Sequence, residues 1–413
     1  MTNPSPLTGV RVLDLSRVLS GPYAGRALAD LGADVVKVES PDGDLTQIWG
    51  EVRAGRSGFY FQQNAGKRSV GVDLKVDGAS DLVVRLAAQS DIVIENFRPG
   101  VADRLGIGWP NLSAQNAGLI MLSISGYGQD DLPAARGAFA PIIHAASGLI
   151  WRQSIRDRMP PMDPMLSIAD LLAGLHGLIA ILAALHLRRS TGLGQHIDMA
   201  MLDAMLATDE YTHHYLDGSP LAKLGGLVWQ ASDGPILIAA DQRHTWLRLS
   251  AAHGLSDECP PDTSTEQKIA ARGRVIAGWI SMQERSKIHS ALAVADLFST
   301  DVVTPECAIE GAIEQRGIVA NVAAGDGGTR RVLELPYRFS GAASQVRGSA
   351  PALAQHNAEV LHDWLAIENE EIFELTHRGI LIEPSGDEPT KTPTATSAGS
   401  ATHRSGLRHG SSE

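Results

Sequence analysis

GVRVLDLSRVLSGPYAGRALADLGADVVKVE, residues 9–39, is the stretch that predicts the fold. Residues 9–15 and 34–39 are short apolar runs typical of buried strands, and residues 23–31 between them have a helical pattern that follows Gly21 and Pro22. Two strands joined through a helix form a parallel pair, because a parallel connection needs a crossover of this length. The chain therefore opens with the unit from which parallel α/β sheets are built.

The same alternation continues to residue 125. Strand-like runs occupy residues 69–74, 91–96 and 119–125, with helical stretches at 79–88 and 101–105 between them. This order predicts an α/β domain with a Rossmann-like, doubly wound parallel sheet, whose ligands bind beyond the carboxyl ends of the strands. No glycine-rich nucleotide fingerprint follows the first strand, so a dinucleotide site is not supported.

The composition changes after residue 221, where loop signals precede a strand-like run at residues 235–240. A chain of 413 residues is too long for one ordinary core, so two domains are expected. We expect a large domain to begin with residues 1–222 and a smaller α/β domain to occupy residues 223–330.

Amphipathic helical patterns return within residues 331–383. They occupy residues 357–365 and 370–378, and Gly379 is a suitable C-cap for the second helix. Residues 384–413 are rich in Ser, Thr, Pro and Gly and nearly free of large apolar side chains, which predicts a disordered tail.

The bulk composition is that of a globular protein. The formal net charge of −12 argues against a nucleic-acid partner. The two cysteines, Cys259 and Cys307, form neither a disulfide framework nor a zinc pattern. The N-terminus lacks signal-peptide features, and residues 171–187 are too short an apolar run for a typical membrane span. We therefore expect a buried core helix at 171–187, no membrane partner, and a cytoplasmic protein.

Asp170 stands out within residues 164–176, PMLSIADLLAGLH, because it is a lone carboxylate at the start of a long apolar helix. Burying an unpaired carboxylate is unfavourable, whereas a covalent nucleophile needs a poorly solvated, ionised oxygen at a fixed point. The alternative is a helix cap, with Ser167 as N-cap and Asp170 in the capping-box position three residues later. This run alone favours the cap, because such caps are common.

Eight segments taken together carry more information than any one of them. They are residues 9–22, 31–41 (LGADVVKVESP), 64–73 (NAGKRSVGVD), 95–106 (ENFRPGVADRLG), 123–129 (SISGYGQ), 168–175 (IADLLAGL), 191–203 (TGLGQHIDMAMLD) and 350–361 (APALAQHNAEVL). In order and spacing this set resembles the class III CoA transferases, the CaiB/BaiF group that contains formyl-CoA and carnitine CoA transferases. The resemblance runs from about residue 6 to residue 382, and Asp170 aligns with the catalytic aspartate of the family.

The resemblance implies a function for Asp170. In this family the aspartate attacks the thioester carbonyl of an acyl-CoA, giving a mixed anhydride and free CoA thiolate. The thiolate then attacks the aspartyl carbonyl, the first acid leaves, and CoA returns onto an incoming acid. The substrates implied are an acyl-CoA and a carboxylic acid, with coenzyme A as part of the substrate and no metal or prosthetic group.

The resemblance also implies an architecture and a CoA site. Family chains build the large domain from both termini, so residues 331–383 are expected to return to it, and two chains interlock as a homodimer. The CoA contacts implied by resemblance are Val18, Leu19, Ser20, Asn64, Lys67, Arg68, Asn96, Phe97, Arg98 and Arg104. Arg17 can contact an acidic substrate or a CoA phosphate, with a structural salt bridge as the alternative.

Three positions depart from the family pattern. Ala140 stands where an acidic residue is common, His144 where glutamine is frequent, and Ser40 where arginine is often found. These departures affect the identity of the acceptor acid more than the chemistry of the aspartate.

Two alternatives to a transferase stay open. The 2-methylacyl-CoA racemases of the same fold pair the aspartate with a histidine, but that histidine lies where this chain has Phe139, which cannot exchange a proton. A non-catalytic CoA-binding paralogue would keep the loops and would not need Asp170. The transferase is the preferred interpretation.

Overall fold

The computed structural model describes residues 3–129, 137–219, 226–257 and 259–384. The chain forms two compact units, of which unit 1 combines the residues up to 209 with those from 318 onward and unit 2 comprises residues 210–317. Composition predicts boundaries after residues 222 and 330. The second unit boundary comes earlier because the hairpin of β12 (Val319–Ala323) and β13 (Thr329–Leu333) packs on α2 (Gly58–Asn64) of unit 1. The predicted disordered tail, apart from residue 384, lies outside the described residues.

Unit 1 contains a six-stranded sheet in which every neighbouring pair of strands is parallel. Its order is β5 (Arg68–Gly71), β2 (Asp34–Glu39), β1 (Arg11–Asp14), β6 (Ile92–Glu95), β7 (Ile120–Ser125) and β8 (Gln195–Ala200). The predicted parallel sheet is confirmed. From β1 the chain adds β2 and β5 on one side of the sheet, and it then adds β6, β7 and β8 on the other side. The direction of winding therefore reverses between β1 and β6. Sheets of this type bind ligands at such a topological switch point.

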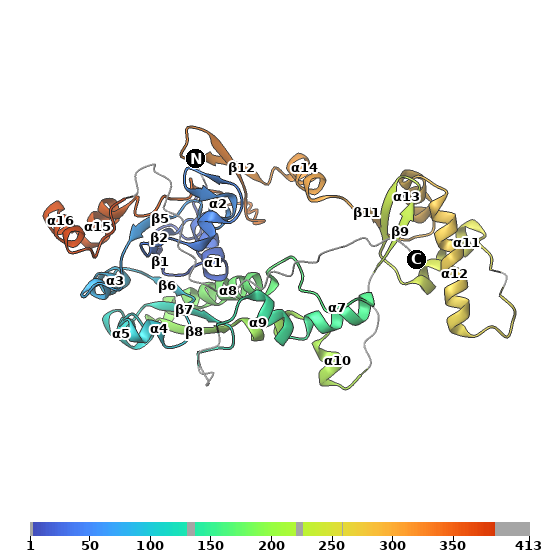
Figure 1. Ribbon diagram of the computed structural model, residues 1–413, viewed down its shortest axis with the longest axis horizontal. Coiled ribbons are helices and arrows are strands. Elements are labelled where there is room, and N and C mark those ends of the chain that lie inside the picture. Colours follow the sequence, from blue (N-terminus) through green and yellow to red (C-terminus); the bar gives the residue numbers. More distant parts are fainter. Residues whose placement is uncertain (1–2, 130–136, 220–225, 258, 385–413) are drawn as a thin grey trace, which may run out of the picture. The chain divides into compact units, whose positions relative to one another are not determined.

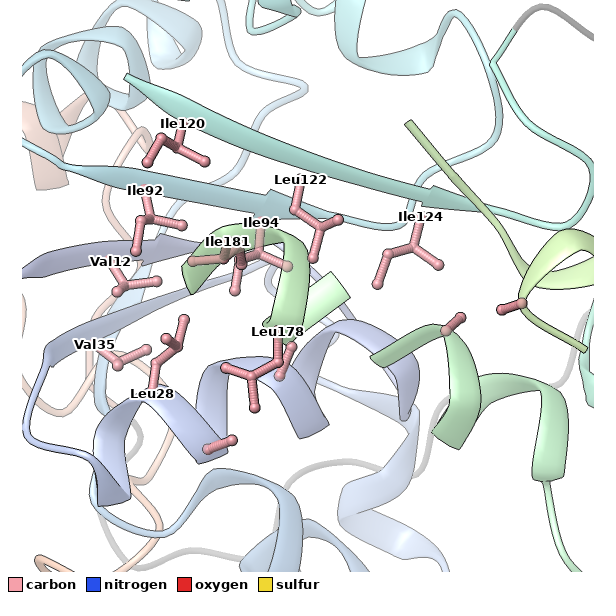
Figure 2. Packing of buried hydrophobic residues seen from close by; sticks show 14 of the residues in the cluster. Val12, Leu28, Val35, Ile92, Ile94, Ile120, Leu122, Ile124, Leu178 and Ile181 are labelled. Atoms are coloured by element: carbon pink, nitrogen blue, oxygen red, sulfur yellow. The ribbon is translucent and has the colours of Figure 1, made fainter. Parts of the chain in front are cut away.

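Helices cover both faces of this sheet (Figure 1). One face carries α1 (Ser20–Asp30), α6 (Ala140–Ala146), α8 (Ile168–Thr191) and α9 (Met201–Thr208). The other carries α3 (Ala79–Ala88), α4 (Val101–Arg104), α5 (Trp109–Gln115), α15 (Asn357–Leu365) and α16 (Asn369–His377). Side chains alternate along each strand and so form two cores. Figure 2 shows Leu28 of α1 and Leu178 and Ile181 of α8 against the strand residues of the first core.

Helix α8 is buried along one stripe only. The buried positions are Ala169, Ala173, Gly174, Gly177, Leu178, Ile181 and Ala184, which recur at helical spacing. Ile179, Leu182 and Leu187 on other faces are exposed, so the expectation of a buried core helix holds for one side of α8. Within the described residues, α8 is also the one helix long and apolar enough to cross a membrane, judged by length and composition alone.

The C-terminal segment returns to unit 1. Helix α15 packs against β5, and Val72 forms an isolated bridge with Leu381. Gly379 has a φ of +74° directly after the last turn of α16, which is the conformation expected of the predicted glycine cap. The remaining elements of unit 1 are η1 (Leu45–Ile48), β3 (Val52–Arg53), β4 (Arg56–Ser57) and α7 (Leu149–Asp157).

Unit 2 has its own small core. Its antiparallel sheet has the order β11 (Ser299–Asp301), β10 (Gly234–Ile238) and β9 (Leu227–Ala231), and β10 covers most of the strand predicted at 235–240. Ile236 and Ile238 pack with Leu249, Ile276 and Ile288 of the helices. These three residues belong to α11 (Gln242–His253), α12 (Thr265–Ser281) and α13 (Arg285–Val294). Unit 2 also contains α10 (Thr212–Leu216) and α14 (Pro305–Arg316).

Candidate active site

The loop that follows β1, Ser16–Leu19, adopts a strained conformation at the switch point. Val18 has a φ of +69°, a region that β-branched residues rarely enter. The loop is held there by side chains beneath it, because the Val18 N–H donates to Asp44 Oδ2 at 3.2 Å and Lys37 Nζ donates to the Ser16 carbonyl at 2.8 Å. Strain that persists under such restraint is typical of functional loops.

Buried charges support this loop. Lys67 Nζ lies 2.8 Å from Asp14 Oδ2, and Lys37 Nζ lies 3.1 Å from Asp44 Oδ2, with all four side chains at most 1% exposed. Burial lowers the pKa of Lys67 to about 8 despite the nearby Asp14 carboxylate. Burial alone would raise the pKa of Asp14, but the ammonium groups of Lys67 and Lys37 outweigh it and hold that pKa below its ordinary value.

The loop after β6 fastens to the loop after β1. Asn96 Oδ1 accepts from the Arg17 N–H at 2.8 Å, and Asn96 Nδ2 donates to the Arg17 carbonyl at 2.7 Å. The preceding Glu95 is buried and accepts from the Phe97 N–H at 2.7 Å. Burial raises the pKa of Glu95 to about 7, although hydrogen bonds from Ser123 and Phe97 oppose the shift.

Asp170 lies in the first turn of α8, where donors from two other loops reach it. The donors that act on its carboxylate are the Ser20 hydroxyl and the backbone amides of Ala140 and Ser20. Ser20 is the first residue of α1 and Ala140 the first residue of α6, so both amides are among the groups left unpaired at a helix start. Burial raises the pKa of Asp170 above its ordinary value, and these donors partly offset that effect.

The capping alternative for Asp170 fails, because His144 caps α8 instead. Ser167 makes no side-chain capping hydrogen bond, whereas the Ala169 N–H donates to His144 Nε2 at 3.2 Å. The proton of the neutral imidazole is therefore on Nδ1, which lies 2.8 Å from Asp163 Oδ1. Both ring nitrogens are engaged, and the ring is buried.

A glycine allows α8 to approach the loop after β1. A Cβ atom added to Gly174, one turn after Asp170, would lie 2.6 Å from the Ser20 carbonyl oxygen. Any larger residue at this position would therefore separate Asp170 from Ser20 or move the loop.

The structure brings together one group of the expected CoA-binding residues. Val18, Leu19 and Ser20 follow β1, and Asn96, Phe97 and Arg98 follow β6, so all six lie at the carboxyl ends of the two strands that flank the switch point. Arg17 and Arg98 in these loops are exposed, as is Arg104 in α4. These three arginines are accessible to an anion.

A second group of expected CoA-binding residues lies elsewhere and has structural partners. Lys67 is buried with its ammonium bonded to Asp14, Asn64 and the Pro22 carbonyl, and Asn64 is also buried. Arg68 lies at the amino end of β5 and pairs with Asp34, Glu359 and Asp363. Their charges are matched by carboxylates within the protein, and contact of these residues with CoA phosphates stays a prediction.

Sequence reasoning missed the residues that support the loops. Lys37 and Glu39 interrupt an otherwise apolar strand, and Glu95 ends another, which is the one signal that could have marked them. Asp44 was not singled out, because its local bonds to Thr46 do not reveal its distant partners Lys37 and Val18. His144 was noted only as a departure from the family pattern, because its partners Asp163 and Ala169 are distant in sequence. Among the described residues, no group of three or more His, Cys, Asp or Glu side chains is arranged to hold a metal ion.

Comparisons with known proteins show the family to which the chain belongs. The profile of CoA-transferase family III matches residues 7–357. The succinyl-CoA–D-citramalate CoA-transferase of Chloroflexus aurantiacus is 31% identical over 402 residues, covering 92% of this chain and 98% of the relative. The succinate–glutarate CoA-transferase of Agrobacterium fabrum is 32% identical over 387 residues, covering 88% and 96%.

A solved structure shares the fold. The crystal structure of a CaiB/BaiF family protein from Brucella suis is 29% identical, with a TM-score of 0.74 over 88% of this chain and all of that one. The expected family and enzyme class are therefore confirmed. The chain belongs to CoA-transferase family III, the CaiB/BaiF family, and is a CoA-transferase.

Proposed function

We propose that this enzyme moves CoA between two carboxylic acids through covalent intermediates on Asp170. The observation that carries the proposal is the setting of the Asp170 carboxylate, which is desolvated and receives donors from the loops after β1 and β7. A nucleophilic carboxylate needs this combination of low solvation and fixed orientation.

The first half of the reaction removes the donor acid. An Asp170 oxygen attacks the thioester carbonyl, the carbon–sulfur bond breaks, and CoA thiolate leaves a mixed anhydride on the enzyme. The thiolate then attacks the Asp170 carbonyl carbon, the bond to the bridging oxygen breaks, and the first acid leaves as its carboxylate. Asp170 is now a CoA thioester, and no proton or electron has been gained or lost.

The second half loads the new acid. The incoming carboxylate attacks the Asp170 carbonyl carbon, CoA thiolate leaves again, and a second mixed anhydride forms. The thiolate attacks the acyl carbonyl of the new acid, the bridging oxygen stays with Asp170, and the product acyl-CoA departs. The amides of Ser20 and Ala140 are suited to stabilise the negative oxygen of the tetrahedral intermediates.

The exposed arginines near the site are the candidates for the CoA phosphates. Arg98 and Arg104 flank the loop after β6, and Arg17 lies in the loop after β1. A guanidinium group binds a phosphate through paired hydrogen bonds. An exposed arginine is open to solvent, so a phosphate can reach it.

We propose short dicarboxylic acids as substrates, with succinyl-CoA as the first donor to test. Support comes from the two relatives named above, whose names give succinyl-CoA or succinate with citramalate or glutarate. A succinyl-CoA:glutarate CoA-transferase of Homo sapiens is also 34% identical over 252 residues.

We also propose that the active enzyme is a homodimer of interlocked chains, as the family resemblance implies. Exposed apolar side chains in unit 1 support a large buried interface, among them Ile179 on α8, Trp151 and Ile155 on α7, and Met165 before α8. Light scattering of the purified protein tests this point, and a monomer would contradict it.

Racemisation is less well supported than transfer. Phe139 carries no titratable group, and His144 is committed to Asp163 and the Ala169 amide. Incubation of a 2-methylacyl-CoA in heavy water tests the racemase alternative, since that reaction would place deuterium on the α carbon.

The decisive experiment traps the intermediate. Purified enzyme is mixed with succinyl-CoA and quenched with hydroxylamine, which should convert Asp170 to a hydroxamate detectable in its peptide by mass spectrometry. Replacing Asp170 with Ala should abolish the adduct and reduce transfer to glutarate by at least about 10⁴-fold, the scale of loss for a missing nucleophile. Unchanged transfer by Asp170→Ala, or the absence of an adduct at Asp170 with every donor, would refute the mechanism and favour a non-catalytic paralogue.

A further inference from the structure

Asn96 bridges the two loops that flank the switch point. Its side-chain amide binds both the N–H and the carbonyl of Arg17, at 2.8 and 2.7 Å, and its Nδ2 also lies 3.3 Å from Ser20 Oγ. The family resemblance implies CoA contact for Asn96, but its oxygen and its amide group already have partners within the protein. The side chain is thus arranged to hold the loop after β1.

The bridge continues through Ser20 to Asp170. Ser20 is 2% exposed, and its carbonyl lies against α8 at Gly174, one turn after Asp170. Its hydroxyl is near enough to Asp170 to lower the pKa of that carboxyl group. A hydroxyl group has one proton to donate and can accept as well. Because Asn96 Nδ2 donates to Ser20 Oγ, the Ser20 proton is left for another acceptor, and the Asp170 carboxylate can only accept when ionised.

We propose that Asn96 is a positioning residue that aims the Ser20 hydroxyl at Asp170, and that Ser20 is a catalytic residue which donates to the reacting carboxyl group. The inference rests on the proposed role of Asp170 as nucleophile. It assigns Ser20 a task in the two steps in which CoA thiolate or a carboxylate attacks the Asp170 carbonyl carbon. In those steps negative charge develops on the Asp170 oxygen, and a donor held in place beforehand stabilises it.

The amino edge of the same sheet offers a matched control. Asn116 also binds backbone groups of neighbouring loops, with Nδ2 donating to the Ser90 carbonyl at 2.9 Å and Oδ1 accepting from the Gly118 N–H at 3.0 Å. It is half-buried like Asn96 and lies before β7, at the end of the sheet away from Asp170. Asn116→Ala therefore removes a comparable loop bridge without touching the proposed site.

The experiment compares Asn96→Ala, Ser20→Ala, their double variant and Asn116→Ala. We expect kcat to fall about 10- to 100-fold in Asn96→Ala and Ser20→Ala, with KM for succinyl-CoA changed less than about threefold. The double variant should lose little more than Ser20→Ala, because Asn96 acts through Ser20. Asn116→Ala should keep kcat. A rise in KM with unchanged kcat in Asn96→Ala would overturn the proposal in favour of direct CoA contact.

A second measurement does not depend on turnover. Carbodiimide with an amine labels protonated carboxyl groups, so the pH midpoint of Asp170 labelling, measured on its peptide by mass spectrometry, reports its ionisation. Loss of the Ser20 donor should raise the midpoint by about half to one pH unit, because a hydrogen bond to the ionised form has been removed. An unchanged midpoint in Ser20→Ala would overturn the hydrogen-bond chain. A raised midpoint in a protein that transfers no CoA would support the chain while refuting the proposed function.

Discussion

The carboxyl ends and the amino ends of the strands in the six-stranded sheet are stabilised in different ways. We call these two sides of the sheet its carboxyl edge and its amino edge. At the carboxyl edge, the loops after β1 and β6 lie over buried charged groups, including Asp14, Lys37, Lys67 and Glu95. At the amino edge, the charged pair Arg188–Asp91 is 22% and 30% exposed, and Arg188 also bonds the Gly118 carbonyl at 3.0 Å. The amino edge thus resembles an ordinary protein surface.

This difference separates the part of the sheet that stabilises the fold from the part that forms the site. Buried ion pairs contribute little net stability, because desolvation offsets their attraction. What they supply at the carboxyl edge is a fixed loop conformation, with Val18 held at positive φ and Ser20 beside Asp170. The four predictions below test whether this division is real.

The largest difference is expected for Lys67 and Arg188. Lys67→Met leaves the Asp14 carboxylate buried with one fewer cation, which should lower the free energy of unfolding by about 3–5 kcal/mol. Arg188→Met breaks a half-exposed pair and a surface hydrogen bond and should cost about 1 kcal/mol. Urea unfolding of both variants measures this difference, and equal losses would remove the distinction between the edges.

Glu95 should make stability depend on pH at the carboxyl edge. Its folded-state pKa of about 7 lies above the ordinary carboxyl value of about 4.3. Between these values the unfolded chain has released a proton that folded Glu95 still holds, so its contribution to stability falls as pH rises through this range. At about 1.4 kcal/mol per pKa unit, the loss should total about 4 kcal/mol.

The Glu95 prediction is measured against Glu95→Gln. The amide keeps an acceptor for the Phe97 N–H but cannot ionise beside Asp103 and Asp198. Urea unfolding near pH 5 and near pH 8 measures the free energy of unfolding of both proteins. Relative to the natural protein, that of Glu95→Gln should be higher near pH 8 than near pH 5. A constant difference between the two proteins would mean that Glu95 ionises normally.

Two glycines of α8 test the comparison within one helix. Gly174→Ala should push the Ser20 carbonyl away and reduce kcat/KM by about 100-fold, the effect of misplacing a reacting group by about 1 Å. Gly177→Ala meets the Leu122 side chain at 2.7 Å inside the core and should affect stability rather than kcat/KM. If the two variants lose the same activity, the approach of α8 to Ser20 has no special role.

Relief of backbone strain should give the smallest effect. Val18→Gly removes a positive-φ cost of about 1 kcal/mol in the loop after β1, but it also loosens that loop and should lower kcat/KM. Ala366→Gly relieves the same strain at the C-cap of α15 and should add up to about 1 kcal/mol of stability at unchanged kcat/KM. Thermal unfolding with kinetics separates them. Full activity in Val18→Gly would show that the strained loop is not needed for function.

The regular elements were well predicted where their signal is local. The predicted helices at 79–88 and 357–365 coincide with α3 and α15, because their apolar spacing and boundaries are written in consecutive residues. β8 was not predicted as a strand, since this edge strand carries exposed polar residues such as Gln195 and His196. The outer face of α8 was assigned to the core because a uniformly apolar helix does not reveal which side is covered.

The parallel α/β sheet, the family and the unusual position of Asp170 can all be inferred from the sequence alone, because each depends on a continuous run of residues or on the order of such runs. Which charged residues are exposed and which are buried in support of the loops depends on the tertiary structure. Lys67 and Arg68 are adjacent in sequence and carry the same charge, and both were expected to contact phosphates. Their partners in the structure are Asp14 of β1 and Asp34 of β2, which the sheet brings close to them. Asn96 likewise meets Arg17 across 79 residues. Such pairings depend on strand order and register, which bring together groups that no local pattern connects.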